Sequence, residues 1–136
     1  MLSPKKVKFK KMHKLRFIGK TLRNTKLRFG NIGIQALEGF RLTSKLIETI
    51  KKTILRYSKK KTKIWIKIFP DRSITMRSKD SRMGSGKGSV KNWIAMIFPG
   101  VIMFELKILT KKLILKLLSV LKDKFPIDTK IIFKKF

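Results

Sequence analysis

The sequence predicts one small domain that combines strands with two helices and carries a basic arm at its N-terminus. The length of 136 residues suits a single domain with a modest core. Two segments place apolar residues at helical spacing, and several short segments are rich in residues that favour strands. The hydrophobic content of 43% argues against a wholly disordered basic tail. We divide the chain 1–136 into the arm, residues 1–28, and a body, residues 29–136, with a loop at 77–91.

The charge balance restricts the possible partners. Lys and Arg number 36 against 7 Asp and Glu, which gives a formal net charge of +29. Because self-repulsion at this charge density opposes compaction, we expect a polyanionic partner. Nucleic acid is the first candidate, an anionic membrane the second and an acidic protein the third. The chain has no Cys, which excludes disulfides and thiolate–metal sites.

The arm contains eleven Lys or Arg residues, and the first acidic residue of the chain is Glu38. Val7, Phe9 and Met12 lie between lysines. This pattern suits an extended segment on phosphates whose apolar side chains touch bases, sugars or the protein body. A solvated tail and an organelle import sequence are the alternatives, and we favour the arm. No apolar segment of the kind found in secretory signals is present.

The first part of the body predicts a strand and a helix. Residues 28–37 are expected to form a strand in which Gly30 and Gly33 allow a bulge or a close backbone approach. Thr43 is the expected N-cap of a helix that ends near Tyr57. Apolar residues at helical spacing should form its core face, namely Leu46, Ile47, Ile50, Ile54 and Tyr57.

The middle of the chain predicts two strands and a hairpin. Residues 63–69 alternate Ile64, Ile66 and Ile68 with Trp65, Lys67 and Phe69, as a strand does. A turn at Pro70-Asp71 precedes a short strand at 73–77 and a loop at 78–89. Residues 92–98 and 101–106 flank Pro99-Gly100 and are interpreted as a hairpin.

A second helix is expected at about 110–124, ended by Pro126, before a last strand at 129–133. Lys111, Lys112, Lys116 and Lys122 interrupt its apolar residues, so no stretch approaches the ~18 residues of a membrane span. The helix could lie on a membrane surface, but a core helix is the favoured interpretation. Its apolar stripe consists of Leu113, Ile114, Leu117, Leu118 and Leu121.

Residues suited to catalysis or metal binding are scarce. His13 is the single His, and it has no partner ligands nearby in the sequence. The seven acidic residues are scattered, and no pair has the context of an acid–base dyad. We therefore expect no enzyme activity, no cofactor and no metal site.

A glycine-rich loop is the most informative segment. Gly84, Gly86 and Gly88 alternate with Ser85 and Lys87, but the spacing fails both the P-loop and the G-x-G-x-x-G patterns. A loop whose bare N–H groups approach phosphates closely remains, and a flexible surface loop is equally consistent. Its flanking cations are Arg77, Lys79, Arg82, Lys87 and Lys91.

Four segments carry a resemblance to a known family. The sequence RMGSGKGS (82–89) resembles the hallmark loop of the L-sixteen family of the bacterial large ribosomal subunit. The opening MLSPKKVKFKKMHK, the helix at 41–57 and the segment KIWIKIFPDRSIT (63–75) resemble the same family in the right order. The expected hairpin with Trp93, Pro99-Gly100 and Glu105 also fits. The resemblance covers nearly the whole chain.

The resemblance implies an α+β fold in which two helices pack on a mainly antiparallel sheet of hammerhead type. It implies a non-catalytic structural protein beside the A-site tRNA, near the peptidyl-transferase centre, with large-subunit rRNA, that tRNA and neighbouring large-subunit proteins as partners. We expect neither membrane insertion nor a homo-oligomer. The expected rRNA-binding residues are Lys5, Lys6, Lys8, Lys10, Lys11, His13, Lys14, Arg16, Arg56, Lys59 and Lys60. The expected tRNA loop residues are Arg77, Arg82, Met83, Gly84, Gly86, Lys87 and Gly88.

The chain also departs from the family pattern. The residues 60–62 replace a usual Gly-Gly pair after the first helix, so the turn there should differ or be strained. The residues 107–109 replace a Gly-rich link, and the second helix is rich in Leu and Lys. Its packing and start are therefore left open, and Lys116 and its neighbours could meet additional RNA or an organelle-specific protein.

The expected location is an organellar ribosome. The family's own opening falls at Met1, so an import sequence is not expected, and Lys outnumbers Arg 28 to 8 as AT-rich coding favours. We therefore expect a gene in the organelle, with the mitochondrion favoured over the plastid by the divergence at 90–94. The competing functions are a cationic membrane-surface protein, with 110–124 as its amphipathic element, and a free RNA chaperone.

Overall fold

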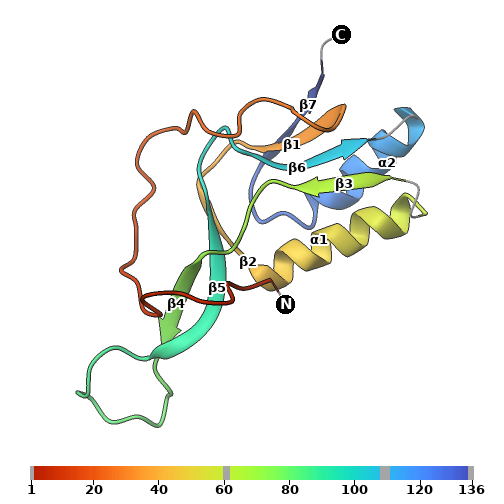
Figure 1. Ribbon diagram of the computed structural model, residues 1–136. Coiled ribbons are helices and arrows are strands. Elements are labelled where there is room, and N and C mark those ends of the chain that lie inside the picture. The colour runs from red at the N-terminus through yellow and green to blue at the C-terminus, as the bar shows by residue number, and fades with distance from the viewer. Residues whose placement is uncertain (1, 60–61, 108–110, 135–136) are drawn as a thin grey trace.

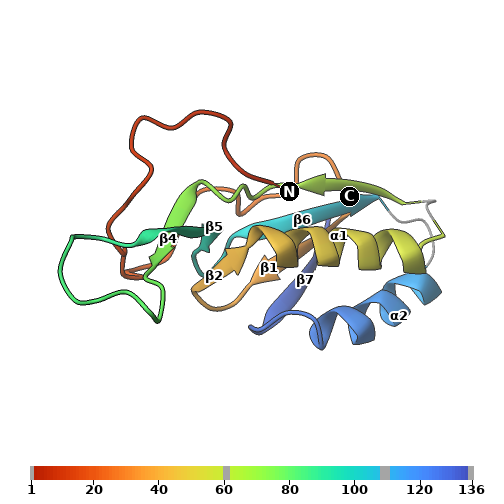
Figure 2. The same ribbon diagram turned by 90° about the horizontal axis from the view of Figure 1, so that it is seen from below.

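The structure is a computed structural model that describes residues 2–59, 62–107 and 111–134. Its strands form two antiparallel sheets, one of four strands in the order β3-β6-β1-β7 and one of three in the order β2-β5-β4. Two helices lie on the same side of the four-stranded sheet (Figures 1 and 2). The α+β fold is thus confirmed, with the expected sheet divided into two.

The four-stranded sheet consists of β3 (Lys63–Ile66), β6 (Ile102–Lys107), β1 (Ile32–Ala36) and β7 (Thr129–Phe133). The strand β7 has the predicted bounds, whereas β1 is shorter than predicted. A Cβ atom at Gly30 would lie 2.6 Å from the Leu106 carbonyl oxygen, so the expected close backbone approach is confirmed. The irregularity in β1 falls between Ile34 and Gln35, and not at the glycines.

The three-stranded sheet consists of β2 (Phe40–Thr43), β5 (Ser89–Ile97) and β4 (Arg72–Met76). The predicted hairpin across Pro99-Gly100 is wrong, because β5 pairs with β2 and β4 while β6 pairs with β1 and β3. Gly100 has a φ of +92°, and its N–H donates to the Ala36 carbonyl at 2.8 Å. The turn therefore binds β1 and passes the chain from one sheet to the other.

The helix α1 (Ser44–Tyr57) begins as predicted, because the Thr43 hydroxyl accepts a hydrogen bond from the N–H of Leu46 at 3.3 Å. Ile47, Ile50 and Ile54 are fully buried under the sheets. Tyr57 is 37% exposed in the last turn, so its assignment to the core was wrong.

The helix α2 (Lys111–Lys122) covers the other half of the four-stranded sheet. Leu117 and Leu121 are buried as predicted, and Leu113 and Ile114 pack at the margin of the core. Phe125, three residues beyond the helix, reaches back to Phe104 with 6.2 Å between ring centroids. The residues 108 and 109 of the altered link lie outside the described residues.

A residue with a strained backbone follows α1, just before the segment 60–62 where a different or strained turn was expected, and the expectation for that segment itself stays a prediction. Lys59 has a φ of +49°, a left-handed conformation that costs a lysine about 1–2 kcal/mol. Its N–H donates to the Arg56 carbonyl at 3.2 Å, which closes the end of the helix. Lys60 and Lys61 are not among the described residues.

Candidate nucleic-acid interface

The arm has two chemically different sides. From residue 2 onward it runs without regular structure, first along the three-stranded sheet and then over the four-stranded one (Figure 1). All eleven of its Lys and Arg side chains are exposed. The side chains of Leu2, Val7, Met12 and Phe17 are instead half-buried against the body. The arm therefore presents its charge outward and turns some of its apolar side chains toward the body, whereas Phe9, Ile18 and Leu22 stay exposed.

Hydrogen bonds fix the arm to the body at intervals. The N–H of Leu2 donates to the Glu48 carboxylate at 2.9 Å, which holds the pKa of Glu48 below its ordinary value. The Ser73 hydroxyl donates to the Lys10 carbonyl at 2.5 Å. Further along, the N–H of Ile102 donates to the Asn24 carbonyl at 2.9 Å. These contacts give the exposed cations a defined arrangement on the surface.

The C-terminal end of the arm is held by Glu105. This side chain is 0% exposed, and its carboxylate accepts hydrogen bonds from the N–H groups of Arg28, Phe29 and Gly30, the last two at 2.7 and 2.9 Å. The ammonium of Lys67 lies 3.3 Å away. Burial alone would raise the pKa of Glu105, but these hydrogen bonds outweigh it and lower that pKa. From the sequence, Glu105 was one of the scattered acids and part of the family-like hairpin, with no role predicted for it, although a lone acid among apolar strand residues was a usable signal.

An aromatic pair lies beside this carboxylate. The rings of Phe29 and Trp65 are stacked, with centroids 6.0 Å apart and an interplanar angle of 20°. Lys67 and Lys63 lie over the two rings at 4.9 and 5.4 Å from their centroids. Cations thus flank a stacked pair of which Phe29 remains 59% exposed.

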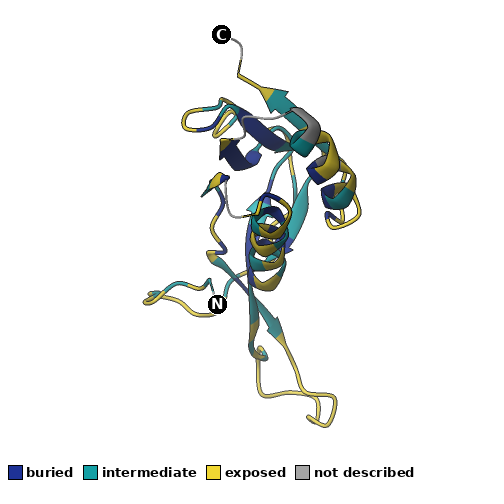
Figure 3. Ribbon diagram, turned by 90° about the vertical axis from the view of Figure 1, so that its right-hand side faces the viewer, coloured by how far each residue is buried: buried dark blue, intermediate teal, exposed yellow. Residues whose placement is uncertain are grey.

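The glycine-rich loop connects β4 to β5 and projects from the far end of the three-stranded sheet (Figures 1 and 3). Gly84, Ser85 and Gly86 have φ values of +95°, +56° and +77°. The Arg77 guanidinium donates to the carbonyls of Arg82 and Gly84, so it closes the loop on itself. Arg82 and Met83 are exposed, Met83 by 98%.

The base of the loop touches the arm. The Lys11 ammonium donates to the Lys87 carbonyl at 2.6 Å, and the Lys87 ammonium donates to the Met12 carbonyl. Lys87, expected to face tRNA, is therefore turned onto the arm. A Cβ atom at Gly88 would lie 2.7 Å from the backbone of Met76, so this glycine permits the close approach of the two strands. At Gly84 and Gly86 a Cβ would meet nothing within 4 Å, and only the positive φ favours glycine.

The expected rRNA-binding residues do not all lie together. His13, Lys14 and Arg16 belong to the exposed arm beside the loop base. Arg56 and Lys59 are exposed at the C-terminal end of α1, where they line a shallow hollow with Lys52 and Leu55. That end of the helix lies on the side away from the glycine-rich loop (Figure 1). Lys60 falls outside the described residues. The cations thus form two basic surfaces, one at the arm and loop and one at the end of α1.

Two kinds of site are missing from the part of the chain that the structure describes. Its His, Asp and Glu side chains do not gather in any group of three or more that could hold a metal ion. Its helices are all too short or too polar to cross a membrane.

The sequence is similar to known proteins along almost its whole length. The family described as Ribosomal protein L16p/L10e matches residues 4–132. The large ribosomal subunit protein uL16c of Phaeodactylum tricornutum is 46% identical over 134 residues, which cover 98% of this chain and 97% of the relative. Its namesake in Emiliania huxleyi is 46% identical over 135 residues, covering 99% and 98% of the two chains. The uL16c protein of Oedogonium cardiacum is 43% identical over 132 residues, which cover 97% of this chain and 96% of the relative.

These names overturn the expectation of a mitochondrion. The suffix c in uL16c marks the chloroplast protein, and the relatives come from diatoms and other algae. The similarity therefore points to a plastid. The mitochondrial interpretation, which depended on the divergence at residues 90–94, was therefore wrong.

Proposed function

The chain belongs to the ribosomal protein L16p/L10e family, whose members are structural components of the large ribosomal subunit and not enzymes, and we propose that it binds rRNA through its arm and helps to position A-site tRNA with its loop. The two roles are assigned to different segments. The arm supplies phosphate neutralisation over a long exposed surface. The loop supplies a small projecting surface at one end.

The main support for the rRNA-binding role is that the arm exposes its cations while some of its apolar side chains pack on the body. All of its Lys and Arg side chains are exposed, while its half-buried apolar groups attach it to the body. A surface of many fixed cations binds a phosphate backbone by releasing its counterions. Because the arm is held by hydrogen bonds, less ordering entropy is lost on binding than for a free tail. The cations at the end of α1 form a second rRNA contact.

The tRNA-binding role rests on the shape of the loop. It projects away from the core, and its tip carries the exposed Arg82 and Met83. Arg77 acts inside the loop by holding the carbonyls of Arg82 and Gly84. Arg82 is thus the cation that meets an RNA phosphate, and Arg77 keeps the loop in the conformation that presents it.

Neighbouring large-subunit proteins are proposed to contact α2. Its outward side carries Leu115, which is 69% exposed, next to the exposed Lys116. An exposed apolar side chain beside a cation suits a protein neighbour or the RNA around it.

Salt dependence tests the rRNA-binding role. Binding of a large-subunit rRNA fragment should weaken steeply with salt, by roughly 0.7 to 0.9 in log K per log unit of salt for each phosphate contacted. Replacing Lys5, Lys6 and Lys8 together by Gln should lower this slope by about two to three such contacts. The matched control replaces Lys122, Lys124 and Lys130, which are also exposed but belong to α2, the segment after it and β7. A slope that is flat, or that falls equally in both variants, would contradict a specific role of the arm.

A further inference from the structure

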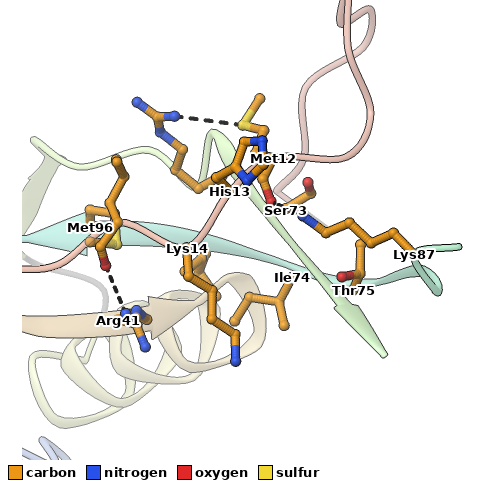
Figure 4. Close-up of a pocket in the computed structure, with 12 residues that line it drawn as sticks. Met12, His13, Lys14, Arg41, Ser73, Ile74, Thr75, Lys87 and Met96 are labelled. Atoms are coloured by element: carbon orange, nitrogen blue, oxygen red, sulfur yellow. Dashed lines mark hydrogen bonds between the residues drawn. The ribbon is translucent and has the colours of Figure 1, made fainter. Parts of the chain in front are cut away.

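A cavity of about 290 Å³ lies between the arm and the outer face of the three-stranded sheet (Figure 4). The arm forms one wall with residues 12–15, and the strands form the other with Arg41, residues 72–75, Ile94 and Met96. Figure 4 shows Met12, His13 and Lys14 of the arm across from Ile74, Thr75 and Met96 of the strands. The cavity volume is near the lower end of the range of small-molecule sites, about 300–1,000 Å³.

Three contacts hold the arm over this cavity. Beyond the bond from Ser73 to Lys10, the Arg41 guanidinium donates to the Leu15 carbonyl at 2.8 Å. The Arg72 guanidinium lies 3.8 Å from the Met12 sulfur. The arm is thus tied on both sides of residues 13 and 14, and its backbone spans the space between the ties.

The walls combine apolar and cationic groups. Met12, Ile74, Ile94 and Met96 provide an apolar surface, and thioethers make favourable contacts with aromatic rings. The charged groups of the lining are all cationic, namely Lys14, Arg41, Arg72 and Lys87, and its His13 can stack on a flat ring. Each guanidinium carries five N–H groups, of which the contacts above occupy one in Arg41 and one in Arg72.

These walls select a ligand that has a flat apolar part and a negative charge. A cationic ligand is repelled by the lining, and a purely apolar one leaves the cations without a partner. A nucleotide has both required parts, and the cavity is too small for a stacked run of bases. RNA offers such nucleotides where an unpaired base is turned out of its stack, which is the form in which proteins most often recognise RNA sequence.

We propose that this cavity receives one unpaired nucleotide of large-subunit rRNA. The base lies against Met12, Ile74 and Met96, and the phosphate is held by Lys14 and Arg41. The proposal rests on the rRNA-binding role of the arm, which brings RNA to the cavity. It adds recognition of one base to the phosphate contacts of the arm.

The first test uses the full chain labelled with ¹³C at the methionine methyl groups. Adenosine 5′-monophosphate is the probe, and ribose 5-phosphate is the matched anion without a base. The methyl signals of Met12 and Met96 should shift saturably with the nucleotide, and much less with the sugar phosphate. Met103, which is 0% exposed in the core, is the internal control and should not move. Equal shifts with both probes, or no shift at Met12 and Met96, would overturn the proposal.

The second test separates this proposal from the rRNA-binding role. An rRNA fragment that the arm binds is made abasic at each unpaired position in turn. One of these changes should weaken binding about tenfold, as loss of a stacked base does. In Met96→Phe, which fills the cavity, the same change should have little effect, whereas Met76→Phe outside the cavity should behave as the unaltered chain. If binding depended on salt but its affinity were unchanged by removal of any base, the cavity proposal would be overturned and the rRNA-binding role would stand. A failure to bind the fragment would overturn both.

Discussion

The Glu105 carboxylate and the Lys67 ammonium form an ion pair, 3.3 Å apart, beneath the point where the arm joins the body. Glu105 also receives three backbone N–H groups from residues 28–30, so one side chain connects β6, the segment after β3 and the arm. The three N–H groups and the ammonium stabilise the negative charge of this carboxylate in place of water, which does not reach it.

Replacing Glu105 by Gln should destabilise the fold by about 2–4 kcal/mol, because the Lys67 charge loses its partner and three N–H groups share a weaker acceptor. The measurement is urea unfolding followed by circular dichroism at neutral pH. Glu38→Gln, at an exposed position, is the control and should change stability by less than about 0.5 kcal/mol. Equal stability of the two variants would mean that Glu105 does not hold the arm.

Acid should remove the stabilisation that Glu105 provides. Since its pKa is lowered in the folded state, the unfolded chain binds the proton more readily. The stabilisation is complete above the unfolded pKa of about 4.3 and is lost as the pH falls through the lower folded value. Unfolding measured from pH 6 to pH 2 should therefore show a steeper loss in the unaltered chain than in Glu105→Gln. Parallel curves would contradict this assignment.

The glycines of the loop should differ in their effect on stability. Gly88→Ala places a Cβ against the backbone of Met76 and should cost about 1–3 kcal/mol, because β4 and β5 must separate. In Gly86→Ala the new Cβ meets open space, so stability should fall only by the cost of the positive φ, about 1 kcal/mol. Thermal unfolding of both variants gives the comparison. A larger loss in Gly86→Ala would show that strand closeness at Gly88 is unimportant.

Arg82→Ala should slow accommodation of A-site tRNA roughly tenfold, the effect of one lost charge-assisted hydrogen bond, and leave subunit assembly unchanged. The rate is measured with reconstituted ribosomes, and assembly by sedimentation. Lys130→Ala, an equally exposed cation on β7, is the control. Lys87→Ala should affect both readouts, because this lysine binds the arm. If Arg82→Ala reduced assembly as much as accommodation, the two roles would not be separate.

Removal of residues 2–14 should have the opposite effect and reduce incorporation into the large subunit several-fold. The deletion takes away six lysines and the contacts with Glu48 and Ser73. Incorporation is measured as the fraction that sediments with the subunit in moderate salt. Full incorporation with slowed tRNA accommodation would reverse the proposed division of roles.

The parts of the fold that local signals determine were predictable from the sequence. The Thr43 cap, the buried face of α1 and the bounds of β7 follow from residues that are neighbours in the chain. The strand β2 was missed, since its four residues end on the helix cap Thr43 itself and are too few to show a period.

The parts that long-range contacts determine were not predictable. The sequence around Pro99-Gly100 suits a hairpin, but the turn bonds Ala36 and Gln35, and β6 pairs with β1 and β3 in the other sheet. The bonds from Lys11 to the Lys87 carbonyl and from Lys87 to the Met12 carbonyl join residues 76 and 75 positions apart, and nothing near either lysine predicts them. For the candidate site, the sequence therefore identified the arm and the loop but not how they are joined.

The order of synthesis gives the arm an unusual history. It leaves the translating ribosome first, yet the groups that fix it come later, from Glu48 through Ser73 and Lys87 to Glu105. At roughly 5–20 residues per second, Glu105 follows Arg28 only after several seconds. During that time the nascent segment is an unattached polycation that any nearby RNA can capture. Its final shape is acquired last, and the RNA it has met by then can influence how it folds.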